Sequence, residues 1–263
     1  MVEKIQDIMP TGAESHVWVG SYDKAKKQME SEGFTEIDLA KNARLRIQQG
    51  KDAYVSRNGN LTSADILILP SGKPRLTRSS IISAFPAEAT QTSRTGEFYV
   101  DSPELKEAYE KALEDSVEID TTAIVAKKFG KSKVASYAFG TSYGENPDKD
   151  AEEAQDYGTF LVKADISEMP INLPNSETRP FARKLWFRYL DVRSGLIADR
   201  YLSNDINRVR GVREVSAEGA SQKVSKPLIL ESRVADALKR KQAFEYKGII
   251  YVPVRGNSIS LKQ

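Results

Sequence analysis

The sequence predicts an α+β protein with mixed sheets and packed helices. Segments of helical periodicity alternate irregularly with short extended runs, which favours this class over a purely helical or purely β protein. The chain has 263 residues, 40% of them hydrophobic, so it can bury a sizeable core. It has no cysteine, which fits a reducing compartment. No apolar run approaches the ~20 residues that cross a bilayer, so we expect a cytoplasmic protein without a membrane partner.

The first 40 residues have the pattern of strand, helix and strand. A short apolar run at 17–19 predicts a strand that ends at Gly20. Tyr22, Ala25 and Met29 then recur at helical spacing, and residues 34–39 return to extended character.

Residues 43–85 favour strands and turns. Leu45 and Ile47 alternate with arginines, and Asn58-Gly59 is a typical hairpin dipeptide between two extended runs. Residues 66–69 form a short apolar run typical of a buried strand.

The clearest helix follows a strand predicted at 98–100. Ser102 is a favourable N-cap, and Pro103 suits the first helical position. Four apolar residues then define one face: Leu105, Tyr109, Ala112 and Leu113. Further along, we expect extended structure at 134–139, a short helix near Glu152 and a strand at 160–166, where apolar and polar residues alternate.

Charge divides the chain near three prolines, at positions 170, 174 and 180. The net charge is +2, but residues 1–178 sum to −8 and residues 179–263 to +10. The sequence therefore predicts an acidic α+β domain at 1–170 and a basic α+β domain or subdomain at 179–263.

Within the basic third we expect a helix at 181–190 and extended structure at 206–215. A last helix, marked by Leu230, Val234, Ala237 and Leu238, precedes a hairpin across Lys247-Gly248 into a strand at 249–252. Helix followed by hairpin is the order found in winged-helix domains.

An aromatic residue within a cationic face favours nucleic-acid binding. Projected as a helix, residues 181–190 place Phe187 among Arg183, Lys184 and Arg188. Cations follow phosphates while a ring stacks on a base. Five more arginines extend this track: Arg193, Arg200, Arg208, Arg210 and Arg213. The leading interpretation is a non-catalytic DNA- or RNA-binding protein without a cofactor.

Two alternatives stay open. Eight carboxylates at 101–120 could form a solvated helix face, or could dock on the basic half and build a self-assembling subunit, such as a homo-oligomer. A metal-dependent hydrolase is the third reading, although the motifs for enzymes are weak. Gly130-Lys131-Ser132 lacks the first glycine of a phosphate-binding loop, since position 125 is Val125, and His16 is the only histidine. We therefore expect no catalytic residues and no metal ligands.

Overall fold

A large mixed sheet with helices on both faces forms most of the protein. The computed structural model describes residues 2–8, 13–92, 96–174, 178–191, 194–198 and 201–214, and three strands at 244–246, 249–254 and 258–262. The chain divides into two compact units, unit 1 (Met1–Arg213) and unit 2 (Glu214–Gln263). The change of charge sign, by contrast, lies at residues 170–180.

The large sheet contains 12 strands within the described residues. Its main path runs, in spatial order, through β1 (Glu3–Ile8), β2 (Ala13–Val19), β12 (Arg208–Glu214), β4 (Asn60–Ile68), β10 (Phe181–Phe187), β11 (Leu196–Ile197), β9 (Glu168–Asn172) and β8 (Ala123–Val125). Four short strands lie off this path, namely β3 (Thr35–Glu36) beside β12, β5 (Arg75–Thr77) beside β4, β6 (Phe98–Tyr99) beside β10 and β7 (Ser116–Glu118) beside β5. β12 is parallel to β4 and β10 is antiparallel to it, so the sheet is mixed.

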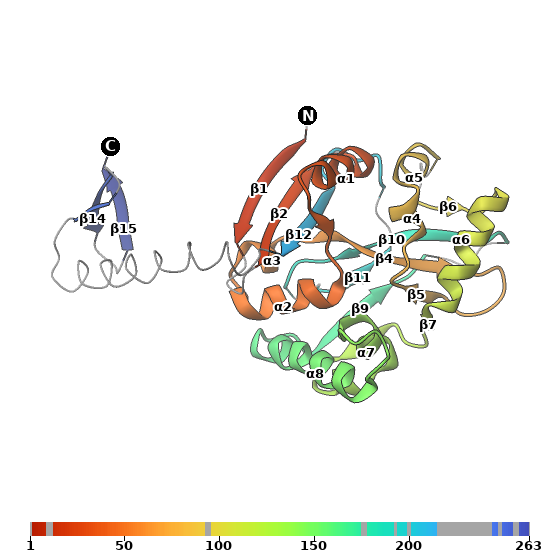
Figure 1. The fold of residues 1–263 in the computed structure, drawn as a ribbon. Helices are drawn as coiled ribbons and strands as arrows, with labels where there is room; N and C mark the ends of the chain where they lie inside the picture. The colour runs from red at the N-terminus through yellow and green to blue at the C-terminus, as the bar shows by residue number, and fades with distance from the viewer. Residues whose placement is uncertain are drawn as a thin grey trace. The chain divides into compact units, whose positions relative to one another are not determined.

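Helices cover the two faces (Figure 1). On one face lie α2 (Leu39–Gln49), the 3₁₀ helix η1 (Ala126–Lys131), α7 (Lys133–Phe139) and α8 (Pro147–Lys163). On the other lie α1 (Tyr22–Ser31), α4 (Ile81–Ala84), α5 (Pro86–Thr92) and α6 (Pro103–Glu114). A single turn, α3 (Tyr54–Arg57), precedes β4. The predicted α+β class with mixed sheets is confirmed.

The central strands β4 and β10 are buried on both faces. In β4, Ile66 and Ile68 belong to the hydrophobic cluster under α2, α7 and α8, whereas Leu67 belongs to the cluster under α1 and α6. In β10, Phe187 and Trp186 divide between the same two clusters. β4 comes from the acidic part of the sequence, and both of its neighbours, β10 and β12, come from the basic third.

The helix predicted at 181–190 is wrong, because these residues form β10. Every residue of β10 except the half-buried Arg183 is buried. A strand covered on both faces does not alternate between polar and apolar residues. The apolar residues on either side of Arg183 and Lys184 therefore also fit the broad face of a helix.

The strand predicted at 160–166 is wrong too, because α8 extends to Lys163. Asn146 caps this helix by accepting the backbone N–H of Lys149, and Pro147 occupies the first turn. The buried positions Tyr157 and Leu161 follow helical spacing. The alternation at 160–166 is a coincidence of composition near a helix end.

Three shorter predictions also fail. Residues 45–47 belong to α2, which begins after its N-cap Asp38, and residues 134–139 form α7, whose N-cap is Ser132. Asn58-Gly59 joins α3 to β4 and makes no hairpin. In the first two cases a side-chain cap upstream, Asp38 or Ser132, starts a helix where the local pattern favoured a strand.

Several predictions are confirmed. The strand at 17–19 lies in β2, the helix from Tyr22 is α1, and the helix capped by Ser102 is α6. Extended residues at 66–68, 98–99 and 208–214 lie in β4, β6 and β12. The helix near Glu152 is part of α8.

Unit 2 contains an antiparallel sheet of the strands β13 (Phe244–Tyr246), β14 (Ile249–Val254) and β15 (Ser258–Lys262). The strand predicted at 249–252 is confirmed. The dipeptide Lys247-Gly248 and the helix predicted from Leu230 to Leu238 lie outside the described residues. In the part of the chain that the structure describes, no helix has the length and apolar character of a membrane span.

Candidate recognition surface

The described residues among the nine predicted nucleic-acid contacts do not gather on one surface. Arg193 and Arg200 lie outside the described residues. The other seven are distributed between the core and separate parts of the surface.

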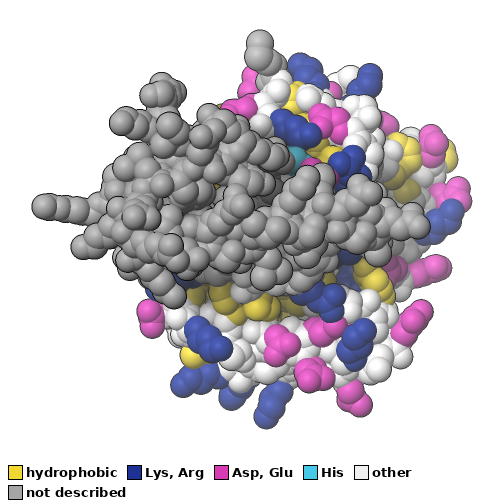
Figure 2. Space-filling model, turned by 60° about the vertical axis from the view of Figure 1, so that its left-hand side comes forward, with side chains coloured by type: hydrophobic (Ala, Val, Ile, Leu, Met, Phe, Trp, Pro, Cys, Tyr) yellow, Lys and Arg dark blue, Asp and Glu magenta, His cyan; other side chains and the backbone are white. Residues whose placement is uncertain are grey.

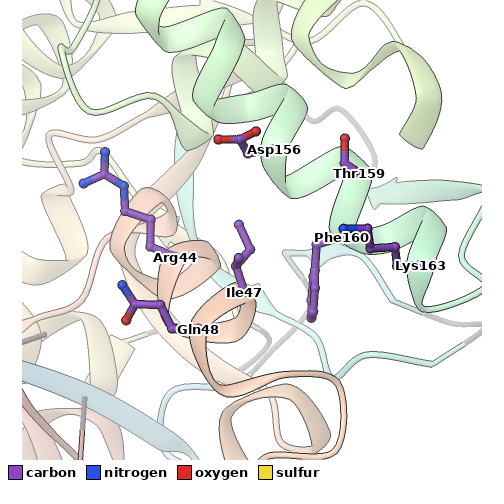
Figure 3. Close-up of a pocket in the computed structure, with 7 residues that line it drawn as sticks. All are labelled: Arg44, Ile47, Gln48, Asp156, Thr159, Phe160 and Lys163. Atoms are coloured by element: carbon purple, nitrogen blue, oxygen red, sulfur yellow. The ribbon is translucent and has the colours of Figure 1, made fainter. Parts of the chain in front are cut away.

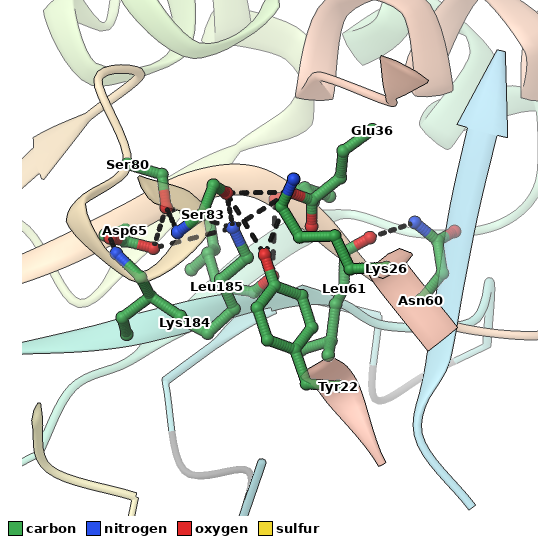
Figure 4. A network of polar contacts seen from close by, with 12 residues as sticks. Tyr22, Lys26, Glu36, Asn60, Leu61, Asp65, Ser80, Ser83, Lys184 and Leu185 are labelled. Carbon is green, nitrogen blue, oxygen red and sulfur yellow. Dashed lines mark hydrogen bonds and ion pairs between the residues drawn. The ribbon is translucent and has the colours of Figure 1, made fainter. Parts of the chain in front are cut away.

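Lys184 is fully buried in a polar network inside the sheet (Figure 4). Its Nζ donates to the Oγ atoms of Ser83 at 2.5 Å and Ser80 at 3.0 Å. Two carboxylates complete the surroundings, with Nζ 3.2 Å from Glu36 Oε2 and 3.7 Å from Asp65 Oδ1. This lysine compensates buried acids from β3 and β4.

A lysine between two serines resembles a nucleophile with its base, but the direction of the hydrogen bonds argues against that role. Ser80 donates to Asp65 at 2.7 Å, and Ser83 donates to Glu36 at 2.7 Å. Lys184 thus donates to both hydroxyls and takes a proton from neither. Burial raises the pKa of Asp65 although Lys184 opposes it, and burial raises the pKa of Tyr22 well above its ordinary value. The network ties β10 to β4, β3 and α4.

Three further residues predicted to bind nucleic acid instead make contacts within the folded protein. Phe187 is fully buried, with the Arg46 guanidinium 3.6 Å above its ring. Arg183 pairs with Glu97 and donates to the Ala198 carbonyl at 2.9 Å. Arg210 is 1% exposed and donates to Ser15 Oγ at 2.9 Å.

The remaining three lie nearer the surface. Arg213 is exposed, pairs with Glu14 and stacks 4.4 Å from the Phe34 ring. Arg188 is half-buried and stacks 5.1 Å from the Tyr189 ring, and Arg208 is half-buried at the start of β12. On the face in Figure 2, cationic and anionic side chains are interspersed over the coloured surface.

The sequence reasoning missed two loops that leave the same end of the sheet. We name them the first loop (188–191 and 194–195, between β10 and β11) and the second loop (201–207, before β12). Phe187, the last residue of β10, pairs with Asn60, and Val209 of β12 pairs with Leu61. The end of β10 and the beginning of β12 therefore flank the first residues of β4, with neighbouring strands about 4.8 Å apart.

Contacts with the scaffold fix the first loop. Arg46 Nη2 donates to the Arg188 carbonyl at 2.7 Å, and the Arg188 N–H donates to the Gly195 carbonyl at 3.0 Å. The Leu190 N–H donates to the Ser56 carbonyl at 2.6 Å. The loop backbone is therefore held on both sides.

The second loop is held from inside by Asn207. Its buried side-chain Nδ2 donates to the carbonyls of Tyr201 at 2.8 Å and Leu202 at 3.1 Å. The N–H of Tyr22, at the start of α1, donates to the Leu202 carbonyl at 2.9 Å. On this fixed backbone Tyr201 is 50% exposed and Ile206 is 61% exposed. Asn204, Asp205 and Asn207 are turn-forming residues around a large apolar side chain, a signal that the sequence did offer.

A hollow lies between α2 and α8 (Figure 3). It encloses about 660 Å³ and is lined by Arg44, Ile47, Gln48, Asp156, Thr159, Phe160 and Lys163. Ile47 and Phe160 supply apolar surface, while charges of both signs stand around them. Within the described ranges, no three His, Asp or Glu side chains come together as a metal site requires.

Comparisons with known proteins indicate the fold. No protein-family model matches the chain, and no curated protein matches it. A solved structure described as "Accommodation of massive sequence variation in Nanoarchaeota by the C-type lectin fold" is similar, with a TM-score of 0.55 and 13% sequence identity. The similarity covers 81% of this chain, about the length of unit 1, and 98% of that chain. The chain is therefore similar in fold to a C-type lectin fold.

The prediction of DNA or RNA binding is wrong, and so is nucleic acid as the partner. The C-type lectin fold of the similar structure is not a nucleic-acid-binding fold, and the likeness gives no support to a winged-helix arrangement. The physical reason for the error is that several of the basic residues in this part of the sequence do not lie on the surface of the folded protein. Lys184 and Arg210, for example, are neutralised or hydrogen-bonded inside the core.

Proposed function

We propose that this chain is a non-catalytic recognition protein that binds a protein ligand through its first and second loops. The observation that carries the proposal is the exposure of Tyr201 and Ile206 on a backbone fixed by buried side chains. Binding residues commonly lie on loops that a rigid scaffold positions. The similar structure, described as accommodation of massive sequence variation by the C-type lectin fold, supports such a division between scaffold and displayed residues.

The residue types favour a protein ligand. Tyrosine offers a large, rigid contact area with a polar tip, and Tyr and Arg are enriched among residues that dominate binding energy. Tyr201, Tyr189 and Arg188 supply these types. Ile206 presents an aliphatic surface without a polar atom, which suits an apolar patch on a protein better than the hydroxyls of a carbohydrate. The cytoplasmic location predicted from the sequence stays a prediction.

Fixed loops also reduce the entropic cost of binding. Ordering a mobile side chain costs about 0.5–1.5 kcal/mol, and ordering loop backbone adds to that cost. The hydrogen bonds from Asn207 and Arg46 order both loops before any ligand arrives. We therefore expect binding with little backbone movement.

The test is selection of ligands followed by substitution of the loops. The purified full chain is used to select binders from a phage-displayed library of folded protein domains, and in parallel it is applied to a glycan array. Tyr201→Ala and Ile206→Ser should each weaken the selected binders about tenfold or more. Matched controls are Tyr143→Ala and Val125→Ser, which change side chains that are 57% and 47% exposed elsewhere.

Selected domains that bind the loop variants as well as the original chain would refute the proposal, as would equal losses in the two controls. Binding of glycans, but of no protein domain, through the same loops would replace the protein ligand by a carbohydrate.

A further inference from the structure

Arg46 lies in the core of unit 1, directly beneath the first loop. Its side chain, on α2, is fully buried. Nη2 donates to the carbonyls of Arg188 at 2.7 Å and Phe187 at 3.4 Å, and Nη1 donates to Tyr157 Oη on α8 at 3.2 Å. The guanidinium also stacks 3.6 Å above the Phe187 ring. One side chain thus joins two helices to the point where β10 becomes a loop.

Burying the charged Arg46 guanidinium costs free energy that packing alone does not explain. Burial lowers the pKa of Arg46, although Tyr157 opposes the effect, which reflects the loss of hydration by its charge. Among the described residues Arg46 forms no ion pair with a carboxylate; its hydrogen bonds go to two carbonyls and a phenol. An apolar side chain of similar volume would fill the same space without burying a charge. Unlike such a residue, the planar guanidinium of arginine donates hydrogen bonds in fixed directions, and so it orients the carbonyls that accept them.

We propose that Arg46 is a positioning residue, which sets the direction in which the first loop leaves the sheet and so presets this loop's part of the proposed binding surface. The inference rests on the proposed function of that surface. The Arg188 carbonyl is held from below by Arg46, while the N–H of the same residue is held by Gly195. Two residues later, the N–H of Leu190 donates to the Ser56 carbonyl. Without Arg46, the first of these anchors is lost and the loop pivots on the remaining two.

Local hydrogen exchange tests the inference without a ligand. The amides of Arg188 and Leu190 report opening of the first loop, and the amides of β4 report opening of the core. Arg46→Met, which keeps an unbranched apolar stem but removes the donors, should lower protection of the loop amides about ten- to a hundredfold and leave β4 protected. Arg46→Lys, which keeps the charge, should restore part of the protection. Arg44→Met is the matched control on the exposed side of the same helix and should change neither.

Binding supplies the second measurement. A protein domain selected on the original chain should lose about tenfold in affinity for Arg46→Met, with the exposed loop side chains unaltered. If loop and β4 amides lose protection together, or if the loop amides keep theirs, the inference is wrong. If Arg46→Met fails to fold, Arg46→Lys is compared with the original chain instead. The same two groups of amides, those of the first loop and those of β4, then test the inference. Loss of loop protection together with failure to select any ligand would uphold the positioning by Arg46 and refute the proposed function alone.

Discussion

Replacing Lys184 by methionine tests whether the buried network of Figure 4 is held by compensation of charge. The Lys184 and Asp65 side chains are both 0% exposed, and that of Glu36 is 5% exposed. Methionine fills similar space but leaves two carboxylates without their cation. Removing one partner from a buried ion pair typically costs about 3–5 kcal/mol, so we expect a loss of that size in the free energy of unfolding.

The pH dependence of this loss has a definite sign. Burial already holds the pKa of Asp65 above its ordinary value of 3.8. A raised pKa means that the contribution of Asp65 to stability is fully present below 3.8 and is lost as the pH rises through the folded value. Lys184 opposes this shift, so its removal should make the loss larger near neutral pH than near pH ~4.

Urea unfolding followed by tryptophan fluorescence measures the loss. The two tryptophans, Trp18 and Trp186, are both buried in unit 1, so the signal reports this unit. Lys106→Met, on the exposed face of α6, is the control and should change stability by less than about 0.5 kcal/mol. Adding Asp65→Asn to Lys184→Met should recover part of the loss, because one unpaired carboxylate disappears. A loss below about 1 kcal/mol, or strict additivity of the two changes, would refute the account of the network.

Three further outcomes are expected. Asp150 accepts the N–H groups of Ser142 and Gly144, each at 2.8 Å. Burial raises its pKa, but these two bonds, a hydrogen bond from the Ser142 side chain and the charge of Arg78 together lower it by more. Its contribution is therefore present above its ordinary pKa of 3.8 and lost as the pH falls through the lower folded value. Asp150→Asn should cost about 1–3 kcal/mol in urea unfolding at neutral pH and less in acid, and an equal cost at both would contradict this. Gly59→Ala should lower the thermal midpoint by overpacking worth about 1–3 kcal/mol, since the new Cβ would lie 2.5 Å from Trp186 Nε1. Gly20→Ala, with a Cβ 3.2 Å from Val2, should cost less, and the reverse order would be inconsistent with the packing. Ser102→Ala should destabilise α6 by about 1 kcal/mol in the same assay, because Ser102 Oγ accepts the Leu105 N–H at 3.1 Å. Ser102→Asp should retain stability, and equal losses for both would mean that the cap is unimportant.

Local signals account for the part of the fold that could be predicted. Ser102 and Pro103 start α6 through their own backbone and side-chain properties, and Tyr22, Ala25 and Met29 bury the face of α1 that their spacing predicts. Such features depend on residues within a few positions of one another. They therefore survive in any tertiary context that supplies an apolar neighbour.

The candidate site could not be predicted in the same way. Arg46 and Arg188, which order the first loop, are 142 positions apart, and the two loops leave the same end of the sheet only because β10 and β12 flank β4. Of the residues first expected to bind nucleic acid, Arg188 alone among the described ones lies in a loop of the proposed surface. Its role there follows from the fold and not from its charge.

The sequence by itself determined the α+β class, the helix capped by Ser102, several short apolar strands and the uneven charge along the chain. Only the tertiary structure decided that residues 181–187 are a strand, because helices that cover both faces of β10 remove the alternation that marks a strand. It also decided which cations are available to a ligand. Lys184 meets Glu36 and Asp65 across 148 and 119 positions of sequence, and ion pairs between such distant residues exist only once the sheet has formed.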